Sequence, residues 1–220
     1  MTDQLAGTLP AGLRWEATVT GDDPDQQVAD ALSLMCRYVR EDAHAPEFLA
    51  QAQRIIPPGT DPLPAIFSYV KRLIGFRHDA ELAETWQVPR AGDLPVVELL
   101  IRPRDMMTFR EDTGSQPQGD CDDYAMLTAA LLRSQGIRAN FVTVAADPSQ
   151  PDQFSHVYVA AYPEGQGRIA LDTSHGEYAG WETANVTRRE EWPIETGWKG
   201  ILIALLLGLT LWAGWKRRSR

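Results

Sequence analysis

The spacing of apolar residues changes along the chain, and each change predicts a different kind of element. Residues 13–20 alternate between apolar and polar side chains, which is typical of a half-buried strand. Asp23-Pro24 supplies an N-cap and a proline at the first helical position, and apolar residues then recur at helical spacing as far as residue 39. Two shorter helices are predicted over 46–55 and 61–74. The segment 87–118 has weak periodicity and several prolines and glycines, so we expect it to be mostly loop.

The most pronounced helical pattern begins at Cys121 and ends at Gly136. Asp122 and Asp123 lie in its first turn, where acidic side chains favour a helix start. Its apolar positions share a face with Cys121, so we expect the thiol to point toward the protein body. Three runs with strand character follow, separated by turn residues, over 138–144, 154–161 and 168–171. A helix packed against an antiparallel sheet in this order predicts an α+β fold.

Composition and charge narrow the functional classes. The chain of 220 residues is 44% hydrophobic and 23% charged, which is typical of a globular protein and excludes a disordered one. The formal net charge is −9, and all the acidic residues precede Lys199. An acidic body repels a phosphate backbone, so we expect no nucleic-acid partner. The two cysteines, Cys36 and Cys121, are too few for a disulfide framework and are interpreted as free thiols.

The C-terminal stretch 200–215 is uncharged and strongly apolar, and a basic tail follows it at 216–220. As a helix it would rise about 24 Å, near the lower limit for crossing a bilayer, with tryptophans near both interfaces. We therefore expect a single-pass membrane protein, with the bilayer as a partner and 191–199 as a linker. The basic tail favours a cytoplasmic C-terminus, whereas the lack of a signal sequence favours a domain that stays inside. The sequence leaves open on which side of the membrane the domain lies.

Three residues are candidates for chemistry. Cys121 begins a helix, whose unpaired backbone N–H groups favour a thiolate and can also stabilise an oxyanion. His156 lies in the second predicted strand, where an imidazole can take the thiol proton and later protonate a leaving group. Asp172 ends the third strand and can hold the imidazole in one tautomer. Three neighbouring carboxylates, at positions 120, 122 and 123, disfavour the thiolate, because repulsion by their negative charges raises the pKa of the thiol.

Four motifs occur in order: Gly-Asp-Cys-Asp-Asp-Tyr-Ala at 119–125, Leu-Leu-Arg-Ser-Gln-Gly-Ile-Arg at 131–138, Ser-His-Val-Tyr-Val at 155–159 and Leu-Asp-Thr at 171–173. Together with the helix at 65–74 they resemble the transglutaminase-like superfamily over roughly residues 62–182. Small members that carry the Gly-Asp-Cys-Asp-Asp motif also resemble proteins encoded by bacteriophages. The resemblance assigns a transglutaminase-like domain to 62–190 and leaves 1–61 as an N-terminal strand and helical extension.

The resemblance implies a papain-like α+β domain with Cys121 as nucleophile, His156 as base and Asp172 as orienting acid. The implied substrate is a protein or peptide amide, and the reaction is either amide hydrolysis or acyl transfer, with hydrolysis slightly favoured. No cofactor and no metal are implied. The alternative is a catalytically silent binding or structural module of the same fold, such as a virion or membrane component.

Other polar residues receive weaker interpretations. His175 follows Asp172 closely and is expected to be a polar turn residue rather than a metal ligand. His44 and His78 are expected at the surface, and Trp181 in the core or on one wall of the site. Gln116 and Gln118 are the nearby candidates for a side-chain oxyanion donor.

Overall fold

The computed structural model describes residues 3–8, 14–19, 23–88 and 99–194. Its helices are α1 (Pro24–Asp42), α2 (Pro46–Ile55), α3 (Pro62–Leu73), α4 (Asp79–Thr85), α5 (Pro103–Thr113) and α6 (Cys121–Ser134). Its strands are β1 (Asp3–Thr8), β2 (Arg14–Val19), β3 (Gly75–Phe76), β4 (Leu100–Ile101), β5 (Gln118–Gly119), β6 (Arg138–Ala145), β7 (His156–Tyr162), β8 (Ile169–Leu171) and β9 (Arg188–Pro193). This mixture of helices and sheets agrees with the predicted α+β class.

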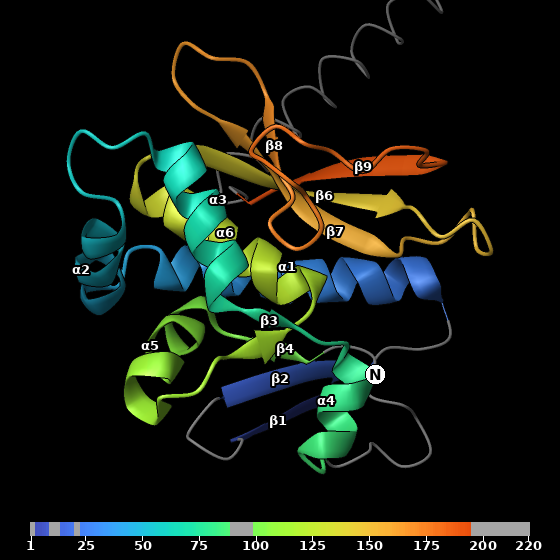
Figure 1. Cartoon of the computed structure of the whole chain (residues 1–220). Helices are drawn as coiled ribbons and strands as arrows, with labels where there is room; N and C mark the ends of the chain where they lie inside the picture. The colour runs from blue at the N-terminus through green and yellow to red at the C-terminus, as the bar shows by residue number, and fades with distance from the viewer. Residues whose placement is uncertain (1–2, 9–13, 20–22, 89–98, 195–220) are drawn as a thin grey trace, which may run out of the picture.

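The largest sheet has the strand order β8-β7-β6-β9, and all its neighbours are antiparallel. A second antiparallel sheet has the order β1-β2-β4, and Figure 1 shows α1 between these two sheets. The third pairing, β3 with β5, is parallel and only two residues long. It joins the end of α3 to the segment that leads into α6, and so positions the start of that helix.

Helix α6 forms the centre of the core. Every residue from Asp122 to Leu132 is buried, because the helix packs against α1 and α3 and against strands β6 and β7. Gly136 follows its last turn with φ of +73°, a left-handed conformation that glycine adopts without strain. The sequence pattern predicted one apolar face for this helix, whereas the structure encloses it on all sides.

The expectation of a loop over 87–118 is wrong for part of that segment, which contains β4 and α5. Only a short apolar group marks α5 in the sequence, and its buried members are Met106 and Met107. The helix packs on α6 and α1, so its stability comes from these tertiary contacts rather than from its own periodicity. Strand β9 was also missed, because its sequence Arg-Arg-Glu-Glu-Trp-Pro has no apolar alternation.

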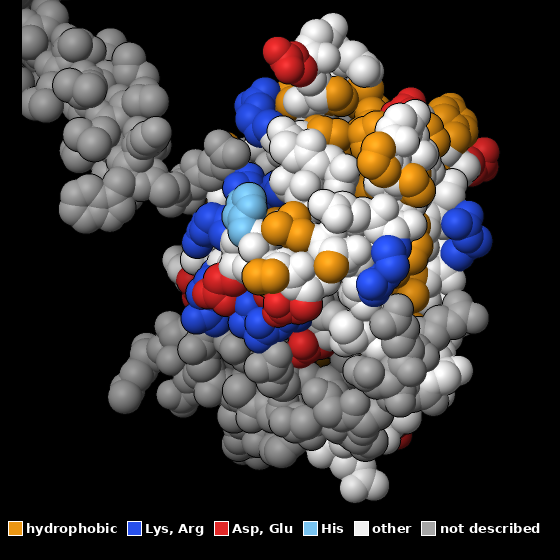
Figure 2. Space-filling model, turned by 90° about the vertical axis from the view of Figure 1, so that its left-hand side faces the viewer, with side chains coloured by type: hydrophobic (Ala, Val, Ile, Leu, Met, Phe, Trp, Pro, Cys, Tyr) orange, Lys and Arg blue, Asp and Glu red, His pale blue; other side chains and the backbone are white. Residues whose placement is uncertain are grey.

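Charged side chains surround the contact between α1 and α5. The carboxylate of Asp42 is fully buried and pairs with Arg102 at 2.6 Å and with Arg104 at 3.7 Å. Arg102 also pairs with Glu41 at 2.6 Å. Figure 2 looks onto the side of the molecule that carries α2 and α5, where acidic and basic side chains lie next to one another and apolar ones occur in small groups.

Among the described residues, no helix has both the length and the apolar character needed to span a bilayer. The predicted membrane helix at 200–215 and the basic tail at 216–220 lie outside the described residues.

Candidate active site

Cys121 is the first residue of α6, and local geometry fixes its position. Asp120 caps the helix by accepting a hydrogen bond from the backbone N–H of Asp122 at 3.3 Å. Gly119 lies in β5, where a Cβ atom would overlap the carboxylate of Asp123, so the position requires glycine. The thiol is half-buried and packs against the main hydrophobic cluster, as the shared face of α6 predicts.

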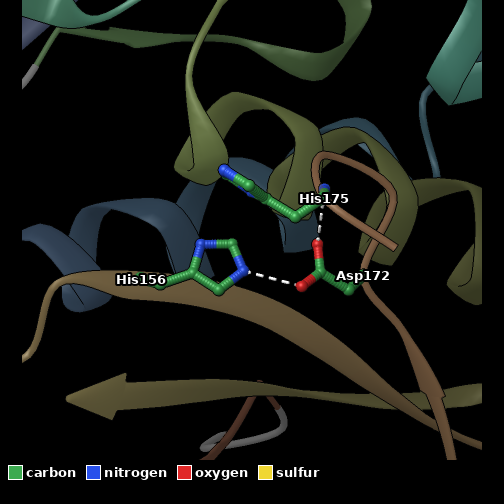
Figure 3. Close-up of side chains that lie close together, drawn as sticks. All are labelled: His156, Asp172 and His175. Carbon is green, nitrogen blue, oxygen red and sulfur yellow. Dashed lines mark hydrogen bonds and ion pairs between the residues drawn. The ribbon is translucent and has the colours of Figure 1, made fainter. Parts of the chain in front are cut away.

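The second and third candidate residues form a hydrogen-bonded pair. His156 begins β7, Asp172 directly follows β8, and the two strands are antiparallel neighbours. The Nε2 atom of His156 lies 2.8 Å from Oδ2 of Asp172, and only 8% of the histidine side chain is exposed (Figure 3). The other ring nitrogen, Nδ1, lies on the opposite side of the ring.

The carboxylate of Asp172 is completely buried, and four groups donate hydrogen bonds to it. Oδ1 accepts from the hydroxyl of Ser174 at 3.1 Å and the backbone N–H of His175 at 2.9 Å. Oδ2 accepts from Thr183 at 3.2 Å as well as from His156. Burial alone would raise the pKa of Asp172, but the hydrogen bond and charge of His156, together with the other donors, lower it to about 2. The carboxylate is therefore ionised at neutral pH.

An ionised Asp172 determines the proton arrangement of the histidine. A carboxylate only accepts hydrogen bonds, so the Nε2 atom that faces it carries a hydrogen. In the neutral ring this leaves the lone pair on Nδ1, which makes Nδ1 the atom that can accept a proton.

Cys121 and His156 line the same two cavities, so the structure brings the thiol and the imidazole to one place. The first cavity has a volume of about 220 Å³ and lies against α1. The second has a volume of about 430 Å³ and reaches Phe76 and Trp181. Asp120, Cys121, Ser155 and His156 contribute to the walls of both. The two cavities therefore meet at the candidate nucleophile.

His175 lies closer to the site than a simple turn residue would. Its ring packs edge-on against that of His156, with centroids 4.7 Å apart, and against Phe76, with centroids 5.1 Å apart. Although His175 is exposed overall, partial desolvation of its ring by neighbouring side chains lowers its pKa. The charges of His156, Lys71 and His78 act in the same direction, and Asp172 opposes them. The one signal in the sequence is its position three residues after Asp172.

Two further residues line the second cavity. His78 precedes α4 and is exposed, as expected, and it also contributes to the wall of this cavity. Trp181 lies on the wall, which is one of the two places expected for it. His44 is exposed, as expected.

The two glutamines proposed as oxyanion donors have other partners. Gln116 donates to the backbone carbonyl of Arg72 at 3.4 Å, and Gln118 accepts from Arg77 at 3.0 Å. Neither is among the residues that line the two cavities. Neither glutamine side chain is therefore placed as an oxyanion donor, and backbone N–H groups at the start of α6 stay the expected donors.

Two groups of side chains in the described part of the chain lie close enough together to hold a metal ion. One consists of His156, Asp172 and His175, and the other of Asp79, Asp120 and Asp122. In the first group, Nε2 of His156 and Oδ2 of Asp172 already bond to each other. The expectation that the protein needs no metal stays a prediction.

Comparisons with known proteins concern the same region. Residues 102–173, about a third of the chain, match the family model of the transglutaminase-like superfamily. A search of curated proteins finds no match to the chain.

Solved structures give more distant similarities. A Cytophaga hutchinsonii protein proposed to be a cysteine protease is 14% identical, with a TM-score of 0.40, over 87% of this chain and 74% of its own. Legionella pneumophila LapG is also 14% identical with a TM-score of 0.40, over 75% of this chain and 86% of its own. The calcium-bound form of LapG is 16% identical with a TM-score of 0.36, over 77% of this chain and 88% of its own. The family match runs from α5 to β8 and bears out the resemblance of the sequence motifs, so this part of the chain is transglutaminase-like.

Proposed function

We propose that the protein is a thiol hydrolase that cleaves amide bonds in a protein or peptide, with Cys121 as nucleophile, His156 as base and Asp172 as orienting acid. The observation that carries this proposal is the His156–Asp172 hydrogen bond of 2.8 Å beside cavities that Cys121 also lines. That bond leaves Nδ1 of the imidazole as the atom that can accept the thiol proton.

The reaction begins when the thiol of Cys121 transfers its proton to Nδ1 of His156. The sulfur then attacks the amide carbonyl carbon, and the negative charge on the carbonyl oxygen faces backbone N–H groups at the start of α6. The imidazolium, stabilised by Asp172, donates its proton to the leaving amine as the carbon–nitrogen bond breaks. This leaves a thioester between the substrate acyl group and Cys121.

Water completes the hydrolysis. Neutral His156 takes one proton from water, and the resulting hydroxide adds to the thioester carbon. The carbon–sulfur bond then breaks, the acid product is released, and the imidazolium returns its proton to the thiolate of Cys121. An amine in place of water would give acyl transfer instead. Ser155 and His175, both in the cavity walls, are exposed, so water has access on this side. Efficient transfer to an amine requires exclusion of water, and this exposure favours hydrolysis.

The predicted anchor at 200–215 supports a location at a membrane. Its uncharged sequence and the basic residues after it are typical of a single membrane-spanning helix. We therefore propose that the hydrolase acts close to a bilayer surface.

The pH dependence of Cys121 alkylation by iodoacetamide tests the proposal. In the full-length protein with Cys36→Ser, we expect Cys121 to react with a midpoint well below the ordinary thiol pKa of about 8.5. His156→Ala in the same background should shift the midpoint upward. With Cys36 retained the label should still go to Cys121, because burial raises the pKa of the Cys36 thiol to about 11. A slow Cys121 thiol that is indifferent to His156 would favour the silent binding module.

A further inference from the structure

One face of α1 forms a wall of the first cavity. Val28, Ala31, Leu32 and Met35 line it, and their spacing of three and four residues places them on the same side of the helix. Ala31, Leu32 and Met35 are buried and Val28 is half-buried. Helix α1 therefore presents a continuous apolar strip to the candidate active site.

The opposite wall adds further apolar surface. It includes Phe154, two residues before β7, Val157 of β7 and Thr143 of β6. A volume of about 220 Å³ corresponds to roughly seven water molecules at about 30 Å³ each. That space is sufficient for one branched aliphatic side chain.

The cavity is continuous with the reaction centre. Cys121 and His156 line both this cavity and the second one, so a carbonyl group at the thiol has substrate on each side of it. His175, in the wall of the second cavity alone, is exposed to solvent. Water must enter and the leaving amine must depart on an open side, which places the acyl part of the substrate against α1.

The two cavities differ in the chemistry of their walls. The second contains three imidazoles, from His78, His156 and His175, and the carboxylates of Asp120 and Asp147. The first combines the apolar strip of α1 with Phe154 and Val157. Its polar side chains are Thr143, Ser155, His156 and, near the start of α6, Asp120 and Asp122. An acidic side chain in the first cavity would meet these carboxylates and be repelled, whereas an aliphatic side chain would bury its surface against α1.

We propose that the α1 cavity is a specificity subsite for an aliphatic side chain on the acyl side of the cleaved amide. Helix α1, which lies before the region that matches the superfamily, thus selects the substrate. This inference rests on the proposed thiol chemistry, because it places the acyl group by reference to Cys121.

Cysteine-directed electrophiles test the subsite without knowledge of the natural substrate. We would measure the alkylation rate of Cys121 by N-acetyl dipeptide chloromethyl ketones in full-length protein with Cys36→Ser. Each reagent forms a thioether with the sulfur and releases chloride. Reagents with leucine at either residue should react at least about tenfold faster than the glycine–glycine reagent. Those with aspartate should be slower than it.

Two variants fill the cavity, and one matched variant does not. Ala31→Leu occupies the interior, and Val28→Phe occupies the half-buried mouth with less risk to folding. Both should bring the leucine-to-glycine rate ratio close to one. Ala29→Leu makes the same chemical change on α1 at a residue that does not line the cavity, and it should retain the ratio.

Iodoacetamide has no side chain to place in the α1 cavity, so its reaction rate reports the thiol chemistry separately from the subsite. The rate of each variant with chloromethyl ketones is divided by its own rate with iodoacetamide, so that a loss of selection is separated from damage to the thiol. Equal rates for the leucine and glycine reagents, or a ratio that survives both filling variants, would overturn the subsite while leaving the thiol chemistry in place. If Cys121 shows no His156-dependent reactivity with iodoacetamide, the hydrolase proposal fails and the subsite fails with it.

Discussion

Replacement of Asp172 by asparagine should destabilise the protein by an amount that depends on pH. The side chain keeps its size, so the buried volume hardly changes. The variant loses the negative charge that accepts hydrogen bonds from His156, Ser174, His175 and Thr183. It also presents either an amide oxygen or an amide N–H to the histidine ring, so the proton arrangement of the pair is no longer determined.

The magnitude follows from the pKa of Asp172, which the folded protein lowers from 3.8 to about 2. At 1.36 kcal/mol per pKa unit, the ionised carboxylate stabilises the fold by about 2.4 kcal/mol more than the protonated one. Because the folded pKa lies below the unfolded one, this stabilisation is present above about pH 4 and is lost as the pH falls toward 2. At pH 3 the linkage relation gives a loss of about 1 kcal/mol.

Urea unfolding of wild type and Asp172→Asn at pH 6 and pH 3 measures this effect. We expect a difference in unfolding free energy of about 2.4 kcal/mol at pH 6, and one about 1 kcal/mol smaller at pH 3. Asp152→Asn, the same change at an exposed position, should stay within about 0.5 kcal/mol of wild type at both values. A difference that is the same at pH 6 and pH 3 would refute the assignment of the stabilisation to an ionised carboxylate.

Three further predictions concern stability and location. Gly119→Ala should cost about 2–4 kcal/mol of unfolding free energy, because the added Cβ overlaps the Asp123 carboxylate. Gly167→Ala is the control, since its Cβ meets nothing within 4 Å. Equal urea midpoints for the two variants would contradict this prediction. Asp42→Asn should cost about 3–5 kcal/mol, because it leaves two arginines without their buried carboxylate, and a loss below about 1 kcal/mol in the same assay would count against it. Deletion of 197–220 should release the protein from lipid vesicles in a flotation assay, and continued flotation of the shortened chain would exclude the anchor.

The sequence predicted the elements in which the buried apolar residues recur at a regular spacing. Helices α1, α2, α3 and α6 and strands β6, β7 and β8 agree closely with the expected ranges. Each has enough apolar residues at a regular spacing to indicate its face. Strand β9 has none, and it is held by pairing with β6 and by side-chain bonds such as that between Trp192 and Thr143. Such contacts depend on a partner distant in the sequence, which a local pattern does not contain.

The same distinction applies to the site. Cys121, His156 and Asp172 could be predicted as candidates because ordered motifs surround them. His175 could not, since its contact with His156 depends on how the segment after β8 folds back. The carbonyl of Gly176 accepts a hydrogen bond from Lys71 on α3, which ties this segment to a helix about a hundred residues earlier in the chain. No spacing of residues in the sequence indicates that the segment after β8 folds back onto α3.

The Gly-Asp-Cys-Asp-Asp motif combines folding contacts with the proposed thiol chemistry, and a single substitution can separate the two. Asp123 accepts a hydrogen bond from the backbone N–H of Ile101 at 2.9 Å, and Gly119 leaves room for its carboxylate. Asp120 caps the helix. A descendant that replaced Cys121 by serine or alanine would lose the thiol yet keep these neighbours, because they hold β4 and the helix start in place. Three of the five residues of the motif therefore have folding roles that do not depend on the thiol, whereas Cys121 carries the proposed chemistry.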